Sequence, residues 1–358
     1  KCFHLGPFSM LRIVKNIIKK EVVPALKSIQ FSFEKIGFKI SGPAKVDFDY
    51  ETLPDFDKGV LLEEIIRSLD IPKNLPYNLL EKLQFFHEHG YVVLEQIINQ
   101  KDLDGVWNQV EEVQENNEKY EIEAIAHRYN NQQDTPIKDI PKEKLKGIGS
   151  RINDFHDYSK LTKEVSSNPS IRVFLEAILE KNVAVFQSLV FKYSSQQGLH
   201  QDFPWVTTSI PSHLAAAWIP LEDVHADSGP LVYYPGSHRM PKFDFGKTGI
   251  LYKGGQSLMH PEKDFTGYLE KTVKALGYKK EILLIKKGDV LIWHGALAHA
   301  GSPILDPNRT RKSLVVHYSS LTALPQHRNS PTVNNESEKV NGVTFYTNNR
   351  LKHLKNIL

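Results

Sequence analysis

Leu199-His200-Gln201-Asp202 places a histidine and an aspartate two positions apart. Side chains alternate along an extended strand, so His200 and Asp202 are expected to point to the same side. An imidazole and a carboxylate on one face supply two of the three ligands of a 2-His-1-carboxylate facial triad, which leaves adjacent coordination positions open on non-heme Fe(II). A second histidine from a distant strand would complete a centre able to activate dioxygen.

Two later histidines can supply the missing ligand. Gly288-Asp289 is a turn signal, and the apolar run at 290–293 that follows it predicts a buried strand. His294 and His299 come directly after that strand. They lie five positions apart, so an unbroken strand would point them to opposite sides, although Gly295 between them can break the strand. The pattern by itself leaves both histidines open as the third ligand.

An arginine stands where an apolar side chain would be expected. The segment 310–318 alternates, so that Arg311, Ser313, Val315 and His317 share one face of a predicted strand. A guanidinium on the inner face of such a strand is costly unless a carboxylate meets it. The simplest partner is the carboxylate of a ligand, held by the guanidinium fork and by the Ser313 hydroxyl. We therefore expect Arg311 to anchor an anion.

Short motifs follow one another through the middle of the chain. They are the segment 85–94, His200-Gln201-Asp202, the segments 217–223, 227–231 and 234–238, Gly288-Asp289-Val290, the stretch from His294 to His299, and Thr310-Arg311-Lys312-Ser313. In this order, over roughly residues 78–320, they resemble the phytanoyl-CoA dioxygenase (PhyH) family of Fe(II)- and 2-oxoglutarate-dependent oxygenases. No single motif is specific, and the resemblance rests on the ordered set.

The resemblance implies roles for the matching residues. His200, Asp202 and His299 would bind Fe(II), which favours His299 over His294 as the third ligand. Arg311 would bind the distal carboxylate of the cosubstrate 2-oxoglutarate.

Two further side chains would complete the cosubstrate pocket. Trp218 falls where the family lines it, and Ser313 lies on the same face as Arg311. With O2 as the other cosubstrate, such an enzyme hydroxylates an unactivated C–H bond of a small organic substrate and oxidatively decarboxylates 2-oxoglutarate to succinate and CO2. The carboxylate of Asp202 favours hydroxylation over halogenation, because a small residue there would open a halide site.

Two other classes of protein fit part of the pattern. One is a cupin-like metal enzyme of another class, which is disfavoured because the histidine-rich strand pair typical of cupins is absent from the sequence and Arg311 sits where a cosubstrate anchor belongs. The other is a non-catalytic jelly-roll binding protein. The presence of His200, Asp202, His299 and Arg311 together argues against it.

The composition is that of an ordinary globular enzyme. The 358 residues are 40% hydrophobic and 24% charged, and the net charge of +3 is too small to favour nucleic acid as a partner. Cys2 is the single cysteine, so the sequence offers no intrachain disulfide, which suits a reducing, cytoplasmic location. No apolar run is long enough to span a bilayer.

The order of elements predicts an α+β fold. Many short strands separated by Gly/Pro turns follow a helical first part, which indicates a double-stranded β-helix, a jelly-roll or cupin-like barrel with helices packed on one sheet. We expect a helical and irregular N-terminal extension at 1–74, the dioxygenase domain at 75–330, and a C-terminal tail at 331–358 that packs on the domain.

Three segments of the chain remain open to more than one interpretation. Residues 10–33 form a basic amphipathic pattern, which favours a helix packed on the domain over membrane contact. The polar segments 114–160 and 239–280 carry little pattern and are expected to connect elements and cover the barrel mouth. Lysines of 240–280, Lys242 among them, allow an anionic substrate such as an acyl thioester, although a solvated loop and helix is the simpler interpretation.

Overall fold

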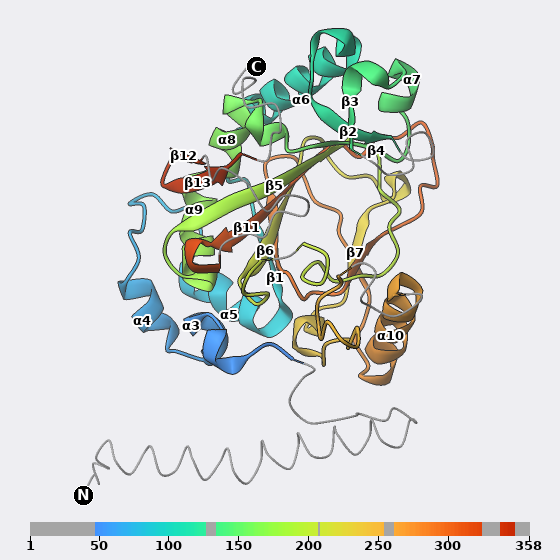
Figure 1. The fold of residues 1–358 in the computed structure, drawn as a ribbon. Coiled ribbons are helices and arrows are strands. Elements are labelled where there is room, and N and C mark those ends of the chain that lie inside the picture. The colour runs from blue at the N-terminus through green and yellow to red at the C-terminus, as the bar shows by residue number, and fades with distance from the viewer. Residues whose placement is uncertain (1–46, 127–133, 207, 254–260, 324–336, 348–358) are drawn as a thin grey trace, which may run out of the picture. The chain divides into compact units, whose positions relative to one another are not determined.

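A large sheet dominates the computed structural model, which describes residues 47–126, 134–206, 208–253, 261–323 and 337–347 (Figure 1). Its strand order is β1-β9-β6-β11-β5-β4-β2-β3, and every pairing along this order is antiparallel. The strands are β1 (Tyr91–Leu94), β9 (Val290–His294), β6 (Leu214–Pro220), β11 (Ser313–Ser320), β5 (Val183–Phe191), β4 (Ser150–Asn153), β2 (Glu123–Ala126) and β3 (Thr135–Pro136).

A second, smaller sheet faces the large one and closes the barrel. It contains β10 (His299–Gly301), β7 (Leu231–Tyr233) and β8 (Glu281–Ile282), again antiparallel. In Figure 1, β7 lies across the interior from β5, β11 and β6. This two-sheet arrangement is the predicted jelly-roll barrel.

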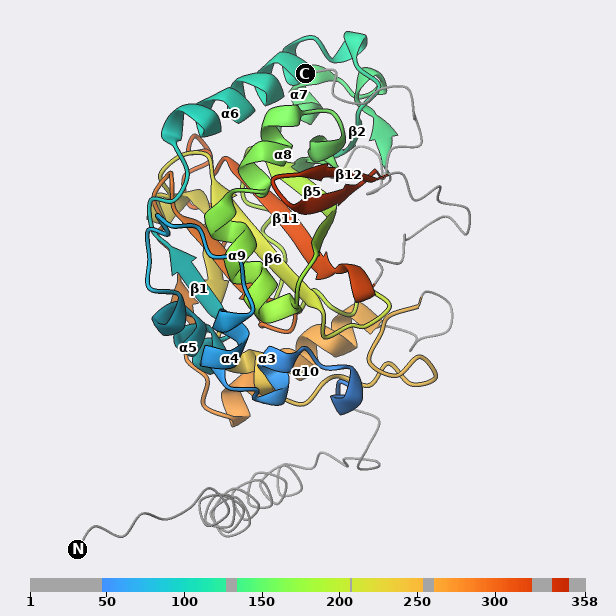
Figure 2. The same cartoon turned by 90° about the vertical axis from the view of Figure 1, so that its left-hand side faces the viewer.

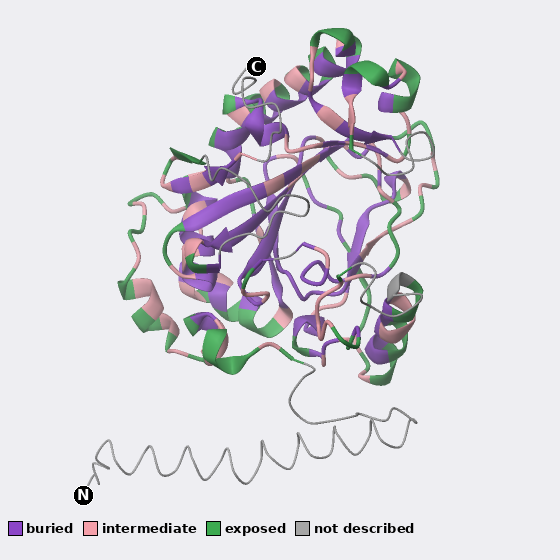
Figure 3. Cartoon of the chain, in the orientation of Figure 1, coloured by how far each residue is buried: buried purple, intermediate pink, exposed green. Residues whose placement is uncertain are grey.

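The period-two alternation of the large sheet separates two apolar layers. Val290 and Ile292 of β9 belong to the main core under the helices, whereas Leu291 and Trp293 belong to the layer inside the barrel. Trp218 of β6 also points into the barrel. Burial is therefore greatest along the central strands, as Figure 3 shows.

Helices cover the outer face of the large sheet. In Figure 2, α9 lies over β6 and β11, and α5 lies beside β1. The helices are α3 (Asp55–Lys58), α4 (Leu62–Arg67), α5 (Leu79–His89), α6 (Gln100–Glu115), α7 (Lys142–Leu145), α8 (Lys160–Ser166), α9 (Pro169–Leu179) and α10 (Pro261–Ala275). Short 3-10 turns are η2 (Tyr50–Thr52), η3 (Asn117–Lys119), η4 (Ile137–Asp139), η5 (Phe155–Asp157), η6 (Ala226–Ser228), η7 (Ser237–Arg239) and η8 (Leu321–Ala323).

Local signals in the sequence explain several helix ends. Gly90 ends α5 in the left-handed conformation, with φ +76°, which glycine adopts readily. Asn168 caps α9 by accepting a hydrogen bond from the backbone N–H of Ser170, and Pro169 begins the helix.

The prediction for residues 114–160 was wrong. This segment is not a featureless connection: it contains β2, α7 and β4, and the two strands extend the large sheet beyond β5. Ala124 and Ile152 are fully or almost fully buried on them. Each strand has four residues, which is too short for an alternating pattern to stand out in a polar stretch.

Lys242 also departs from expectation. Instead of facing solvent, its side chain is buried, with Nζ 3.0 Å from the carbonyl oxygens of His238 and Met240 and 3.3 Å from a carboxylate oxygen of Asp47. These contacts stabilise the charge in the loop before α10, so Lys242 is not available to a substrate.

The ends of the described chain join the same core. Phe56 of α3 and Phe345 of β13 (Val343–Tyr346) both lie in the main apolar cluster. β13 pairs with β5 in parallel and with β12 (Ser337–Val340). The boundaries 1–74, 75–330 and 331–358 stay a prediction, and the amphipathic segment 10–33 lies outside the described residues. Among the described helices, none combines the length and apolar character needed to cross a membrane.

Candidate metal centre

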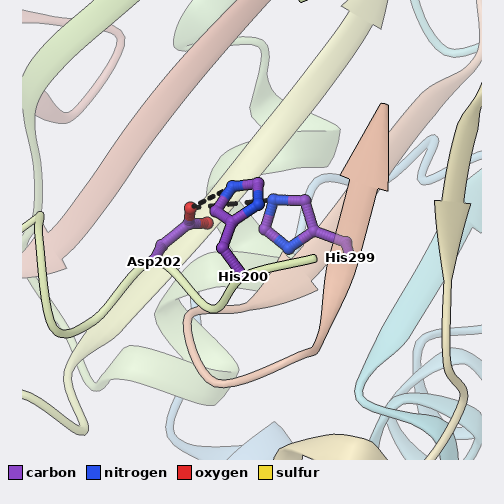
Figure 4. A group of neighbouring side chains, drawn as sticks. All are labelled: His200, Asp202 and His299. Atoms are coloured by element: carbon purple, nitrogen blue, oxygen red, sulfur yellow. Dashed lines mark ion pairs between the residues drawn. The ribbon is translucent and has the colours of Figure 1, made fainter. Parts of the chain in front are cut away.

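His200, Asp202 and His299 converge in one cluster inside the barrel (Figure 4). One ligand atom from each lies within 4.8 Å of the others. Nε2 of His200 is 3.6 Å, and Nε2 of His299 is 3.7 Å, from the same carboxylate oxygen, Oδ1 of Asp202. Two imidazole nitrogens and one carboxylate oxygen therefore surround a common point, as a facial triad requires.

Pairing to the small sheet brings the two histidines together. His200 and His299 form an antiparallel bridge, with backbone N–H to O distances of 3.0 Å and 2.9 Å in the two directions. The segment around His200 was expected to be a strand, but it is only this bridge. The chain then bends, and the Asp202 N–H donates to the carbonyl oxygen of Gly295 at 2.9 Å. The bend still leaves both side chains on the same side.

Backbone carbonyls determine which imidazole nitrogens face the centre. Nδ1 of His200 is 2.8 Å from the carbonyl oxygen of Gly198, and Nδ1 of His299 is 3.0 Å from that of Leu297. A carbonyl oxygen only accepts, so each Nδ1 carries a proton, and in the neutral ring the lone pair lies on Nε2. Such second-shell contacts orient histidine ligands in metal sites.

The protonation states suit a cation. Burial and, after it, the nearby His299 lower the pKa of His200 from its ordinary 6.5 to about 4, so this imidazole is neutral at pH 7. Burial alone would raise the pKa of Asp202, but His299, His317, His200 and the Trp293 N–H outweigh it and lower this pKa below its ordinary value. The cluster therefore presents two imidazoles and one ionised carboxylate, a donor set that fits Fe(II).

The structure separates His294 from this cluster. Its Nε2 lies 3.5 Å from a carboxylate oxygen of Asp57, and its Nδ1 accepts the N–H of Ala296 at 2.9 Å. Both nitrogens are thus engaged elsewhere, and His299 is the histidine that meets His200 and Asp202.

Arg311, Ser313 and Trp218 form a second group inside the barrel. Arg311 is 3% exposed; its Nη1 donates to the carbonyl oxygen of Gly229 at 2.8 Å, and its guanidinium carbon is 5.5 Å from the centre of the Trp218 ring. Burial lowers the pKa of Arg311 to about 10, which leaves it charged at pH 7. Among the described residues, neither Nε of Arg311 nor Oγ of Ser313 has a hydrogen-bond partner. Among the described residues, these two buried donors on one face have no acceptor, so a bound ligand could supply one.

A cavity of about 340 Å³ opens beside His200. Arg151 of β4 lines it, together with the aromatic side chains of Phe191, Trp205 and Phe265. No sequence pattern indicated Arg151, because it lies in the stretch interpreted as a connection.

Trp293 is the other residue of the centre that the sequence analysis missed. Its indole Nε1–H donates to Oδ2 of Asp202 at 2.8 Å. Alternation along 290–293 could have placed this side chain inside the barrel, but nothing in the sequence pairs it with a residue so far away along the chain.

Comparisons with known proteins agree with the geometry. The model of the family "Phytanoyl-CoA dioxygenase (PhyH)" matches residues 86–313. The peroxisomal phytanoyl-CoA dioxygenase of Bos taurus is 22% identical over 253 residues, covering 67% of this chain and 68% of that protein. Its Homo sapiens counterpart is 23% identical over 273 residues, covering 70% and 72%.

Solved structures share the fold. EctD from S. alaskensis, solved with 2-oxoglutarate and 5-hydroxyectoine, aligns with a TM-score of 0.53 at 15% identity, covering 80% of this chain and 87% of that one. The epimerase SnoN, solved with Fe3+, alpha ketoglutarate and nogalamycin RO, aligns with a TM-score of 0.51 at 16% identity, covering 69% and 86%. Since the family model spans more than half of the sequence, this chain belongs to the phytanoyl-CoA dioxygenase (PhyH) family of Fe(II)/2-oxoglutarate-dependent oxygenases.

Proposed function

We propose that this protein hydroxylates an unactivated C–H bond of a small organic substrate, with Fe(II) bound by His200, Asp202 and His299. The observation that carries the proposal is the convergence of the three ligand atoms within 4.8 Å. The Nδ1 contacts to backbone carbonyls support it, because they turn both Nε2 lone pairs toward the same point.

Arg311 and Ser313 are proposed to hold the cosubstrate. A five-carbon diacid has a carboxylate at the end away from the metal, and that group can accept from Nε of Arg311 and Oγ of Ser313, two buried donors without a partner among the described residues. The Trp218 ring packs beside the guanidinium, and both side chains are almost completely buried. Within the barrel this removes competition from solvent and strengthens the ion pair.

The protein's own side chains bind and orient, and the bound groups supply the oxidation. Fe(II), 2-oxoglutarate and O2 together provide a C–H hydroxylation that converts 2-oxoglutarate to succinate and CO2. None of the cluster's side chains has to act as a general base, because a metal-centred oxidation of this kind needs no protein group to remove a proton from the substrate. The carboxylate of Asp202 supports hydroxylation over halogenation, since it occupies the place that a halide would need.

The cavity beside His200 supports an anionic substrate. Among the described residues that line it, Arg151 carries a permanent charge, and the walls formed by Phe191, Trp205 and Phe265 suit an apolar body next to an anionic group. We therefore propose a small molecule with a carboxylate, phosphate or similar group; an acyl thioester could enter with its acyl end.

Anaerobic spectroscopy tests the cosubstrate assignment. Fe(II) and 2-oxoglutarate added to the wild-type protein should produce a weak visible charge-transfer band. We expect Arg311→Ala to remove or greatly weaken this band at the same concentrations. A missing band in the wild type, or a band unchanged in Arg311→Ala, would contradict the proposal.

Turnover tests the metal ligands and the substrate class. Asp202→Ala should abolish the slow succinate release that occurs without substrate, and retained release would remove Asp202 from the ligand set. A metabolite screen scored by stimulated succinate release then identifies the substrate. Detection of a hydroxylated product completes the assignment, whereas an epimerised or cyclised product would replace hydroxylation by another oxidation.

A further inference from the structure

The carboxylate of Asp202 has two oxygens with different neighbours. Oδ1 is 3.6 Å from Nε2 of His200 and 3.7 Å from Nε2 of His299. Oδ2 accepts the indole N–H of Trp293 at 2.8 Å and lies 3.9 Å from Nε2 of His317. One oxygen thus faces the candidate metal position, and the other is held by the barrel wall.

We propose that Trp293 is a positioning residue that restricts Asp202 to one-oxygen coordination of the metal. The inference rests on the proposed function, since it assumes a metal at His200, Asp202 and His299. A carboxylate can bind a cation through one oxygen or through both. The hydrogen bond to Oδ2 fixes the plane of the carboxylate and occupies the oxygen that a two-oxygen mode would require.

The number of coordination positions on the metal explains why one-oxygen coordination by Asp202 would matter. A six-coordinate metal that takes two imidazoles, one carboxylate oxygen and two atoms of a chelating cosubstrate has one position left, which is the advantage of the facial triad. If Asp202 bound through both oxygens, that last position would be filled. Trp293 would thereby keep a position accessible without itself touching the metal.

Trp293 is well fixed for such a role. It is 3% exposed on β9, in register with Tyr91 of β1 on one side and with Ala216 of β6 on the other. Its ring also packs against the ring of His299, with 5.3 Å between the centroids. An indole N–H donates but does not accept or titrate, so it recognises the ionised carboxylate throughout the ordinary pH range. One side chain therefore orients two of the three proposed ligands.

Replacement of the indole tests the proposal through metal binding. Trp293→Phe keeps an aromatic ring and removes the N–H donor. We expect the Kd for Co(II), measured by its visible d–d absorption, to rise by about 10- to 100-fold, as is usual when a second-shell partner of a ligand is lost. The Co(II) spectrum should also change shape, because a released carboxylate alters the coordination number.

Trp107→Phe is the matched control. Trp107 of α6 is likewise buried, and its Nε1–H donates to a carboxylate oxygen of Glu111 at 2.6 Å, but it lies on a helix outside the barrel. This variant loses an equivalent indole–carboxylate hydrogen bond, and its Co(II) affinity and spectrum should equal those of the wild type. The comparison separates a general loss of packing from an effect on Asp202.

Indole NMR signals of the full chain give a second readout that needs no variant at Trp293. The sequence has four tryptophans, and Phe variants of the other three assign the Trp293 signal by elimination. Addition of Zn(II) draws charge from the carboxylate and should shift the Trp293 N–H signal, while the Trp107 signal stays in place. This measurement decides the matter if Trp293→Phe does not fold.

The outcomes distinguish this inference from the proposed function. Wild-type protein that binds no Co(II), or an Asp202→Ala variant that binds it equally well, defeats the proposed function. Normal wild-type binding with a Trp293→Phe variant that matches it within about twofold and gives the same spectrum defeats the positioning role alone. An unshifted Trp293 signal in Zn(II)-loaded protein would also overturn it.

Discussion

Single backbone contacts give His294 and His299 different orientations. His299 uses Nδ1 on the carbonyl oxygen of Leu297, whereas His294 uses Nδ1 on the N–H of Ala296 and directs Nε2 to Asp57. Five residues apart on one chain, the two imidazoles have opposite surroundings. The difference is invisible in the residue types and is made by the local hydrogen bonds.

Asparagine substitutions at the two positions measure this difference. Asparagine can keep the hydrogen bond made by Nδ1 and removes Nε2. His299→Asn should lower Co(II) affinity by more than the roughly 10- to 100-fold expected for a second-shell loss, because it removes a proposed ligand. His294→Asn should bind Co(II) like the wild type. The reverse order in a Co(II) titration would assign His294 as the ligand instead.

A lysine substitution at the buried Arg311 tests its proposed role in binding 2-oxoglutarate. Arg311→Lys keeps a positive charge but loses the planar fork, so the 2-oxoglutarate carboxylate would lose at least one charge-assisted hydrogen bond, worth about 1.5–3 kcal/mol. The Kd for 2-oxoglutarate, titrated through the anaerobic charge-transfer band, should rise by about 10-fold or more.

Arg309→Lys is the control for that experiment. Arg309 lies two residues away in an exposed ion pair with Asp306, and its replacement should leave the affinity unchanged. Equal effects of the two lysine variants would show that Arg311 does not hold the cosubstrate.

For single residues, the sequence predicts which side chains share a face of a strand, but it does not predict contacts between residues on different strands of the barrel. Alternation places Arg311 and Ser313 on one face, and the two-residue spacing brings His200 and Asp202 to one side. The hydrogen bond between Trp293 and Asp202 joins residues from distant parts of the chain. No local pattern encodes such a contact, so only the fold reveals it.

Among the secondary-structure elements, the connection from α5 to β1 depends on one glycine. Gly90 has φ +76°, and a Cβ there would overlap the ring of His238 in η7. The end of α5, the start of β1 and η7 thus meet where only a glycine fits.

Alanine substitutions at two glycines separate the energetic cost of a left-handed backbone from the cost of a steric overlap. Gly59, at the end of α3, has φ +80° and nothing within 4 Å of its added Cβ. Gly59→Ala should cost only the left-handed backbone, about 1–2 kcal/mol. Gly90→Ala should cost about 1–3 kcal/mol more because of the overlap with His238. Urea unfolding of both variants measures the difference, and equal losses would rule out the tight contact.

Element prediction succeeded where the pattern was long enough. α5 and α9 can be recognised from the sequence, since each has eleven residues with a clear helical period and a cap. The four-residue strands β2 and β4 escaped detection because their apolar positions are too few and their partners lie elsewhere in the sheet. Their stability comes from pairing with β5 rather than from their own propensity.

The fold of the whole molecule depends on which strands pair with each other, and local sequence patterns do not specify these pairs. The alternation of short strands and turns predicts a barrel, but the pairing of β1 with β9 or of β5 with β11 joins segments far apart in sequence. The ordered resemblance to a family implied which distant residues share one site, whereas the pairing of the strands comes from the structure alone.

Buried histidine links three distant parts of this arrangement and makes the fold sensitive to acid. His156 of η5 is completely buried, with Nδ1 2.7 Å from Oγ of Ser188 on β5 and Nε2 3.2 Å from the carbonyl oxygen of Tyr346 on β13. Burial lowers the pKa of His156 from 6.5 to about 4. The folded chain therefore keeps this ring neutral where the unfolded chain takes up a proton.

The sign of the pH effect follows from that difference. Above about pH 6.5 neither state is protonated at His156 and its contribution to stability is complete; as the pH falls to about 4 the unfolded state gains a proton first, so stability falls, by about 3 kcal/mol in total. His156→Gln should unfold at lower urea concentrations at pH 7 and should lose less stability than the wild type between pH 7 and pH 4.

His225→Asn is the matched control, because His225 is half exposed and asparagine can keep its cap on η6. That variant should retain the full wild-type pH dependence of the free energy of unfolding. If His156→Gln also retained it, the proton would bind His156 equally in both states, and the acid sensitivity would come from other titratable groups. His213 and His238 would then be tested in turn, since burial lowers the pKa of each.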